Sequence, residues 1–314
     1  MRSLLEEATP HTTTSPAEQL RATMAAVRVS VRWFGTRRAL TSEQKAEAAD
    51  TFGAEQDFLS AAKKLIDTSD PSFKAVTSVR NKAIAYWRSL TLPFPENGLR
   101  LIRQDKVDAF VAQMQQFQAE LEEAVATLDR HYLQLKSAAR QRLGRLYSDA
   151  DYPQSLAGLF HLDFDFPSVE VPSYLRQLNP ELYQQECQRV QARFDEAVRL
   201  AEDAFCAELA KLISHLTERL SGTDDGKPKV FRDSAVENLT AFFQRFRELN
   251  VRSSDQLDRL VADTQRIVRG VEPQALRDNA GLRQHVATEI SRVQSVLDGM
   301  LVDRPRRAIL RRPK

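Results

Sequence analysis

The chain has 314 residues, of which 42% are hydrophobic and 28% charged, and its formal net charge at pH 7 is +2. This composition is typical of a soluble helical protein with one extended or two compact domains. Only ten residues are glycine, and neither GxGxxG nor GxxxxGKS/T occurs, which argues against nucleotide-binding folds that use glycine-rich loops.

The N-terminal region, residues 1–102, is predicted to combine helices with a strand. Ser15 is followed by proline, a pair that favours the start of a short helix. From residue 27 to residue 33 apolar and polar side chains alternate, which predicts a half-buried strand. This alternation places Arg28 and Arg32 on the same face of the strand.

Two further helices are expected before residue 90. Thr41 begins a capping box, and we predict a helical region from there to about Asp67. A second helix is predicted over residues 72–90, where apolar residues recur on one side. The segment TLPFPENG, residues 91–98, contains two prolines and an Asn-Gly pair, so we expect a loop there.

Residues 103–222 are predicted to form an elongated antiparallel helical hairpin with coiled-coil character. The first helix is expected from Asp105 to Tyr147 and the second over 180–221, with an extended connection over 150–178. The first helix carries a heptad seam formed by Phe110, Met114, Phe117, Leu121, Leu128 and Leu135. Neither helix can bury its apolar side alone, so we expect them to pack together or against a partner protein through this seam.

A helical bundle is predicted over residues 223–302, with helices at about 233–250, 254–269 and 273–302. Ser253 begins a capping box for the second of these helices, and Gly270 is a suitable C-terminal stop.

The two cysteines and the chain start bear on the cellular compartment. Cys187 and Cys206 are expected in one straight helix, which places them about 28 Å apart at 1.5 Å per residue, too far for a disulfide. We therefore expect buried thiols. No apolar run reaches the roughly 20 residues of a membrane span, and the start lacks the apolar core of a signal peptide, so we expect a cytoplasmic protein.

The segment FHLDFDFP, residues 160–167, alternates aromatic or aliphatic residues with polar ones. On a strand, His161, Asp163 and Asp165 would share one face and could hold a divalent metal. The alternative, which we favour, is a strand that buries its phenylalanines and pairs with residues 27–33, where arginines complement the acids. No cofactor or catalytic residue is then expected, although a metal-dependent enzyme that uses this face is a further hypothesis.

The C-terminal tail, residues 303–314, has six basic residues and one acidic residue, a net charge of +5. Its basic residues are Arg304, Arg306, Arg307, Arg311, Arg312 and Lys314. Such a cluster can bind nucleic acid or another polyanion by releasing counterions from phosphates. It can equally be a solvated chain end, which is common for charged termini that contain proline.

The order of three segments resembles a known family. These are VRVSVRWFGTRRAL, then LPFPENGLRLI, then DKVDAFVAQMQQFQAELEEAVATLDRHYLQLK. Together they resemble an uncharacterised family of mainly helical proteins encoded by bacteria, phages and mobile elements. Its members are associated with MoxR-type AAA+ ATPases and von Willebrand A-domain proteins. The resemblance covers residues 25–220 and implies a non-enzymatic accessory role, with no active residues to carry over.

These observations lead to one main functional hypothesis. We expect a non-enzymatic scaffold or adaptor that binds other proteins, among them an AAA+ ATPase or further copies of itself. The alternative is a nucleic-acid-binding accessory protein that acts through its arginine-rich tail.

Overall fold

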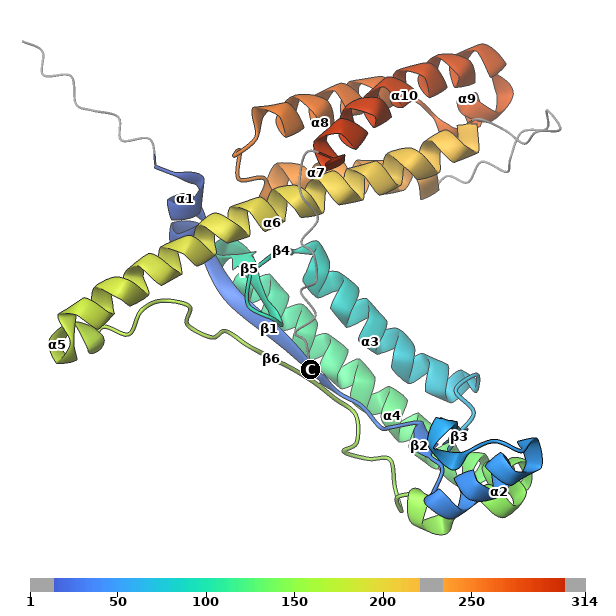
Figure 1. Cartoon of the computed structure of the whole chain (residues 1–314). Helices are drawn as coiled ribbons and strands as arrows, with labels where there is room; N and C mark the ends of the chain where they lie inside the picture. The colour runs from blue at the N-terminus through green and yellow to red at the C-terminus, as the bar shows by residue number, and fades with distance from the viewer. Residues whose placement is uncertain (1–13, 221–233, 303–314) are drawn as a thin grey trace, which may run out of the picture. The chain divides into compact units, whose positions relative to one another are not determined.

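A computed structural model describes residues 14–220 and 234–302 of the chain (Figure 1). It is mainly helical, with a small antiparallel sheet. The chain forms two compact units, each built from separate stretches of sequence. The bundle unit contains the residues up to Ala26, Leu90–Gln104 and the residues from Ser168 onward. The seam unit contains Val27–Ser89 and Asp105–Pro167.

The bundle unit is organised around the helix α6. Its elements are α1 (Pro16–Thr23), β4 (Thr91–Pro93), β5 (Leu99–Arg103), α5 (Leu175–Leu178), α6 (Pro180–Leu220), α7 (Ser234–Leu249), α8 (Asp255–Val268), α9 (Pro273–Asp278) and α10 (Ala280–Val302). Helix α6 packs against α1, α7 and α10 and against β4. The apolar side chains of these elements form one continuous core, in which Phe205 contacts Phe242 and Phe246 edge to face.

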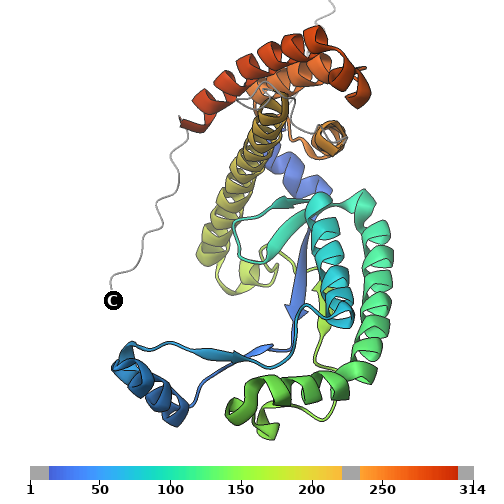
Figure 2. The same cartoon turned by 90° about the vertical axis from the view of Figure 1, so that its right-hand side faces the viewer.

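The seam unit is organised around the helix α4. Its elements are β2 (Arg37–Ala39), α2 (Ser42–Phe52), β3 (Ala62–Lys64), α3 (Pro71–Ser89), α4 (Val107–Leu143) and β6 (His161–Asp165). Strands β2 and β3 pair antiparallel, so that α2, which lies between them in sequence, is carried at the end of a two-stranded ribbon (Figure 2). Among the residues that the structure describes, there are also four short 3-10 helices, at Gln56–Phe58, Gln104–Lys106, Gly144–Leu146 and Asp149–Asp151.

Strand β1 (Met24–Arg32) continues directly from α1, and the sheet order is β4-β5-β1-β6. The predicted pairing of residues 27–33 with the FHLDFDFP segment is confirmed, because β1 and β6 are antiparallel with Arg28 opposite Asp165. Arg32 lies opposite His161 instead of an acid. The period-two pattern was therefore sufficient to predict both strands and one of the two expected charge pairs.

The phenylalanine face of β6 is buried most deeply at its start. Phe160 and Leu162 are buried, Phe164 is half-buried, and Phe166 is 38% exposed. The rings of Phe164 and Phe166 still contact Phe110 of α4, with centroids 5.8 Å and 6.2 Å away. The expectation that the strand buries its phenylalanines is thus met at Phe160, met in part at Phe164 and not met at Phe166.

All six residues of the predicted heptad seam on α4 are buried. The elements that pack on α4 within the seam unit are α3 and β6. Tyr86 of α3, for example, stacks on Phe110 with centroids 6.1 Å apart. The predicted antiparallel hairpin of the two long helices is not confirmed, because each of them packs against elements of its own unit. A heptad pattern specifies an apolar stripe of suitable period but not the element that covers it.

Several predicted boundaries were wrong for local reasons. Helix α2 ends at Phe52 and does not continue to Asp67, because Gly53 takes a left-handed conformation with φ of 61° and terminates the helix. Similarly, Gly144, with φ of 51°, ends α4 at Leu143, before Tyr147. The predicted loop at 91–98 is correctly non-helical, but its first three residues form a strand that pairs with β5.

Three details of the bundle unit also differ from the prediction. The expected single helix 273–302 is two helices, because Asn279 ends α9 and its side chain accepts a hydrogen bond from the Leu282 amide of α10 at 2.9 Å. Ser254, not Ser253, caps α8 by accepting from the Leu257 amide. Both cysteines are free, but only Cys206 is buried, whereas Cys187 is half-buried.

Candidate interaction groove

The three candidate metal ligands on β6 have separate surroundings. A ring nitrogen of His161, Nε2, lies 2.6 Å from the carbonyl oxygen of Gly158, while Asp165 Oδ1 accepts from Arg28 Nε at 2.9 Å. Asp163 is exposed and lies opposite Ser30. Across residues 14–220 and 234–302, no group of three or more His, Cys, Asp or Glu side chains is placed to hold a metal ion.

Replacing Asp165 by asparagine is expected to change stability little at pH 7 and to make it less sensitive to acid. The hydrogen bond from Arg28 lowers the pKa of the Asp165 carboxyl, so the stability it adds is present above its unfolded pKa and is lost as the pH falls through the folded value. Both side chains are about half exposed, which keeps the contribution small. Urea unfolding of the unmodified chain and of Asp165→Asn at pH 7 and at pH 3 measures the difference in stability. A large decrease in the free energy of unfolding of Asp165→Asn at pH 7 would contradict the prediction.

The basic tail residues Arg304, Arg306, Arg307, Arg311, Arg312 and Lys314 lie outside the described residues. The tail therefore remains a candidate polyanion contact on the basis of its sequence alone.

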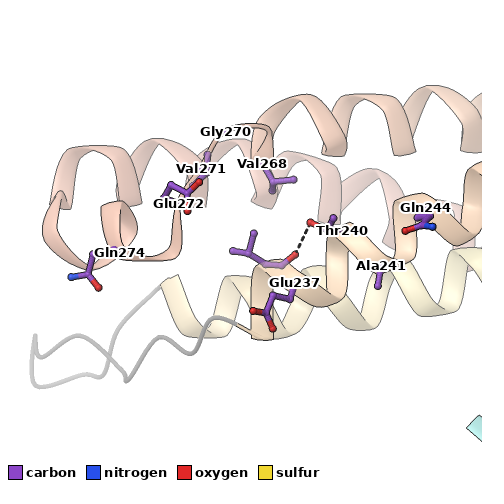
Figure 3. A pocket seen from close by; sticks show the side chains of 10 residues that line it. Glu237, Thr240, Ala241, Gln244, Val268, Gly270, Val271, Glu272 and Gln274 are labelled. Carbon is purple, nitrogen blue, oxygen red and sulfur yellow. Dashed lines mark hydrogen bonds between the residues drawn. The ribbon is translucent and has the colours of Figure 1, made fainter.

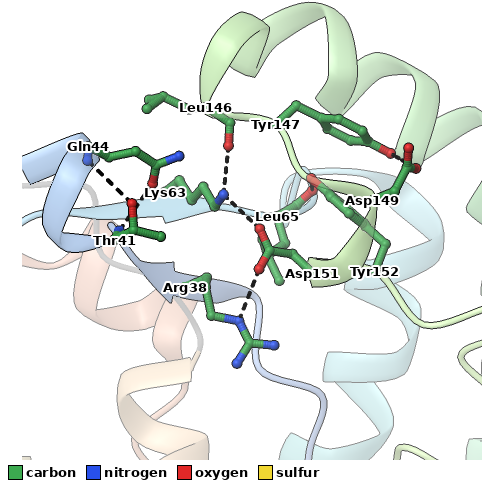
Figure 4. Close-up of polar contacts among 10 residues, drawn as sticks. All are labelled: Arg38, Thr41, Gln44, Lys63, Leu65, Leu146, Tyr147, Asp149, Asp151 and Tyr152. Carbon is green, nitrogen blue, oxygen red and sulfur yellow. Dashed lines mark hydrogen bonds and ion pairs between the residues drawn. The ribbon is translucent and has the colours of Figure 1, made fainter.

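A buried polar cluster joins the β2–β3 ribbon of the seam unit to the chain that follows α4 (Figure 4). The side chain of Lys63 is 4% exposed, and its Nζ lies 2.6 Å from Asp151 Oδ2 and donates to the Leu146 carbonyl oxygen, also at 2.6 Å. Arg38 Nε lies 3.5 Å from the other oxygen of Asp151. Nearby, the hydroxyl of Tyr152 donates to the Leu65 carbonyl at 2.8 Å.

This cluster has the residue types of an acid–base site but the contacts of a structural one. The Lys63 amine is engaged by a carboxylate and a carbonyl of its own unit. Burial raises the pKa of Tyr152 to about 12, so its hydroxyl remains a hydrogen-bond donor even in mildly alkaline solution. These contacts hold three segments together, and we assign them no catalytic role.

A concave surface of a size suited to a ligand lies between α7 and α8 of the bundle unit (Figure 3). Helix α7 turns Leu239, Phe242 and Phe246 into the core and packs on α6, whereas α8 packs mainly on α10. Helices α7 and α8 pack less closely against each other than α7 packs on α6 or α8 packs on α10. Two adjoining hollows of about 800 Å³ and about 490 Å³ lie along it and share Thr240, Gln244, Val268 and Gly270. We call this continuous hollow the α7–α8 groove.

The α7–α8 groove has an apolar floor and a polar rim. The largely buried side chains of Phe243, Phe246, Val261 and Val268 line its floor. The small residues Ala241 on α7 and Ala262 on α8 are exposed along its sides and keep it open. An apolar floor with a polar rim is the usual make-up of a protein–protein interface.

The two ends of the α7–α8 groove carry opposite charges. Glu237 and Glu272 line the end where α7 begins. Arg247 and Arg252 line the other end, together with Asp258, which accepts a hydrogen bond from Asn250 at 2.6 Å. Arg269 follows the end of α8 and precedes Gly270, so it borders the second hollow on the side of Glu272. Sequence reasoning did not identify these residues, because their proximity depends on how far apart α7 and α8 are held.

Comparisons with protein-family models, with characterised proteins and with solved structures find no match for this chain. Among the described residues, no helix is both long enough and apolar enough to cross a membrane.

Proposed function

We propose that this chain is a non-enzymatic scaffold or adaptor that binds another protein through the α7–α8 groove. The observation that carries the proposal is the open edge of the bundle between α7 and α8, with its apolar floor and charged rim. Interlocking side chains fill the space where helices pack closely. The open hollow along the α7–α8 edge therefore leaves room for a chain from another protein.

The identity of the partner is proposed from the sequence resemblance alone. The family that residues 25–220 resemble is associated with MoxR-type AAA+ ATPases and von Willebrand A-domain proteins. An ATPase of this type, or its von Willebrand A-domain companion, is therefore the first partner to test. The α7–α8 groove lies outside the stretch that carries the resemblance, so partner identity and groove function can be tested separately.

Filling the α7–α8 groove is expected to abolish partner capture without unfolding the chain. Ala241→Arg places a long charged side chain in the groove from an exposed position on α7. Asn238→Arg adds the same side chain at an exposed residue of α7 that does not line the groove, and serves as the matched control. Tagged proteins recovered from the native host, with bound proteins identified by mass spectrometry, measure the difference.

We expect Asn238→Arg to retain the partners captured by the unmodified chain and Ala241→Arg to lose them. Equal recovery with both variants would show that the groove is not the binding site. Retention on DNA that weakens with salt and disappears on deletion of residues 303–314, with no captured protein, would favour the nucleic-acid alternative instead.

A further inference from the structure

From the shape and charge of the α7–α8 groove, we propose that its ligand is an amphipathic α-helix of the partner, bound in one direction. Its N-terminus lies at the Glu237 and Glu272 end, and its C-terminus lies at the Arg247 and Arg252 end. The bound helix therefore runs parallel to α7 and antiparallel to α8. This inference rests on the proposed function and adds the secondary structure and orientation of the ligand.

The length of the groove suits a helix of about four turns. The lining residues extend from Val236 on α7 to Asn250, directly after the end of this helix. At 1.5 Å per residue this stretch is about 21 Å long, which a partner helix of about 14 residues would match. A hollow bounded by two helices receives a third helix readily, because side chains along one helical face fit between the rows on its neighbours.

The lining of the groove requires an amphipathic ligand. Phe243, Phe246, Val261 and Val268 would contact an apolar stripe with residues spaced three and four apart. Gln244 and Thr240 on one side and Gln265 on the other would meet the polar residues that flank such a stripe. A helix also satisfies its own backbone groups, so the apolar floor needs to supply no hydrogen bonds to it.

The direction of the ligand follows from the charges at the two ends of the groove. A helix has a partial positive charge at its N-terminus and a partial negative charge at its C-terminus. Glu237 and Glu272 would attract the N-terminal end, and Arg247 and Arg252 the C-terminal end. Asp258 reduces the positive charge of the second end, and Arg269 reduces the negative charge of the first. Each end keeps its sign, because two like charges there outnumber the single opposite one.

The orientation can be tested with two designed helical peptides of about 15 residues and identical composition. Both carry leucines at positions i, i+3, i+4 and i+7 and a side-chain lactam on the outer face, so that both are equally helical. The forward peptide has lysines in its first turn and glutamates in its last turn, and the reverse peptide has these exchanged. Fluorescence anisotropy with the full chain gives both dissociation constants. We expect the forward peptide to bind about tenfold more tightly at low salt.

A charge-reversed variant provides the decisive control. Glu237→Lys, Glu272→Lys, Arg247→Glu and Arg252→Glu together alter exposed positions, so helicity measured by circular dichroism should not change. In this variant the reverse peptide should bind more tightly than the forward one. The inference would be overturned if the two peptides bound each protein with equal affinity, or if neither peptide showed saturable binding. Either result would leave the outcome of the capture experiment with Ala241→Arg undecided, so the two proposals can fail separately. Tighter binding of a synthetic peptide of residues 303–314 would overturn it by assigning the groove to the basic tail.

Discussion

Replacing Leu128 by alanine is expected to lower the free energy of unfolding of the seam unit by about 2–5 kcal/mol. Leu128 lies in the buried seam of α4 and has no exposed surface. The change removes apolar contacts and leaves a cavity that the surrounding side chains can fill only in part. Alanine is itself a strong helix former, so the loss would not arise from helix propensity.

Leu133 provides the matched control because it lies on the same helix and is 75% exposed. Leu133→Ala should change the free energy of unfolding by less than about 0.5 kcal/mol, as most surface substitutions do. The two tryptophans of the chain, Trp33 and Trp87, both belong to the seam unit, so tryptophan fluorescence in urea follows the unfolding of this unit. Similar midpoints for the two variants would show that the seam is not the core of the unit.

Replacing Lys63 by methionine is expected to cost about 3–5 kcal/mol of stability in the same unit. Methionine has a similar size, but it leaves Asp151, whose side chain is 17% exposed, without its closest cation. The Leu146 carbonyl also loses the donor that reaches it at 2.6 Å. Removing one member of a buried ion pair is costly because the remaining charge cannot be solvated fully by water.

Two further variants isolate the effect of the Lys63–Asp151 ion pair. Lys64→Met changes the exposed neighbour of Lys63 and should have little effect. The double variant Lys63→Met, Asp151→Asn removes the carboxylate that has lost its closest cation and should recover part of the lost stability. If the double variant instead has a lower free energy of unfolding than Lys63→Met, the loss of the ion pair is not what destabilises the Lys63→Met protein.

The sequence predicted the elements that have strong periodicity. The alternation in residues 27–33 and 160–166 identified two strands and their pairing, because period two determines which face is buried. The seam on α4 was identified for the same reason, since leucine and phenylalanine recur at heptad spacing over a long helix. Ser15 also caps α1 as expected, with Glu18 completing the capping box.

Three other features could not be predicted from the sequence because they depend on contacts between elements. The β2–β3 ribbon consists of two three-residue strands rich in arginine and lysine, which have no apolar alternation to detect. The partner of the α4 seam is set by tertiary packing, which periodicity does not specify. The α7–α8 groove cannot be predicted from the sequence either, because Glu237 and Glu272 line one hollow only after α8 has folded back along α7.

The division of the chain into two interleaved units constrains the order in which it can fold during synthesis. Translation proceeds from the N-terminus, and domains generally fold once all of their residues have left the ribosome. Helix α1 packs on α6, which begins at Pro180, so α1 must wait for more than half of the chain before its partner exists. The seam unit, by contrast, is complete once Pro167 has emerged. We therefore consider chains stalled on the ribosome after Pro167 has emerged but before α6 has emerged. In these chains the seam unit should resist protease, while the residues of the bundle unit should still be cleaved.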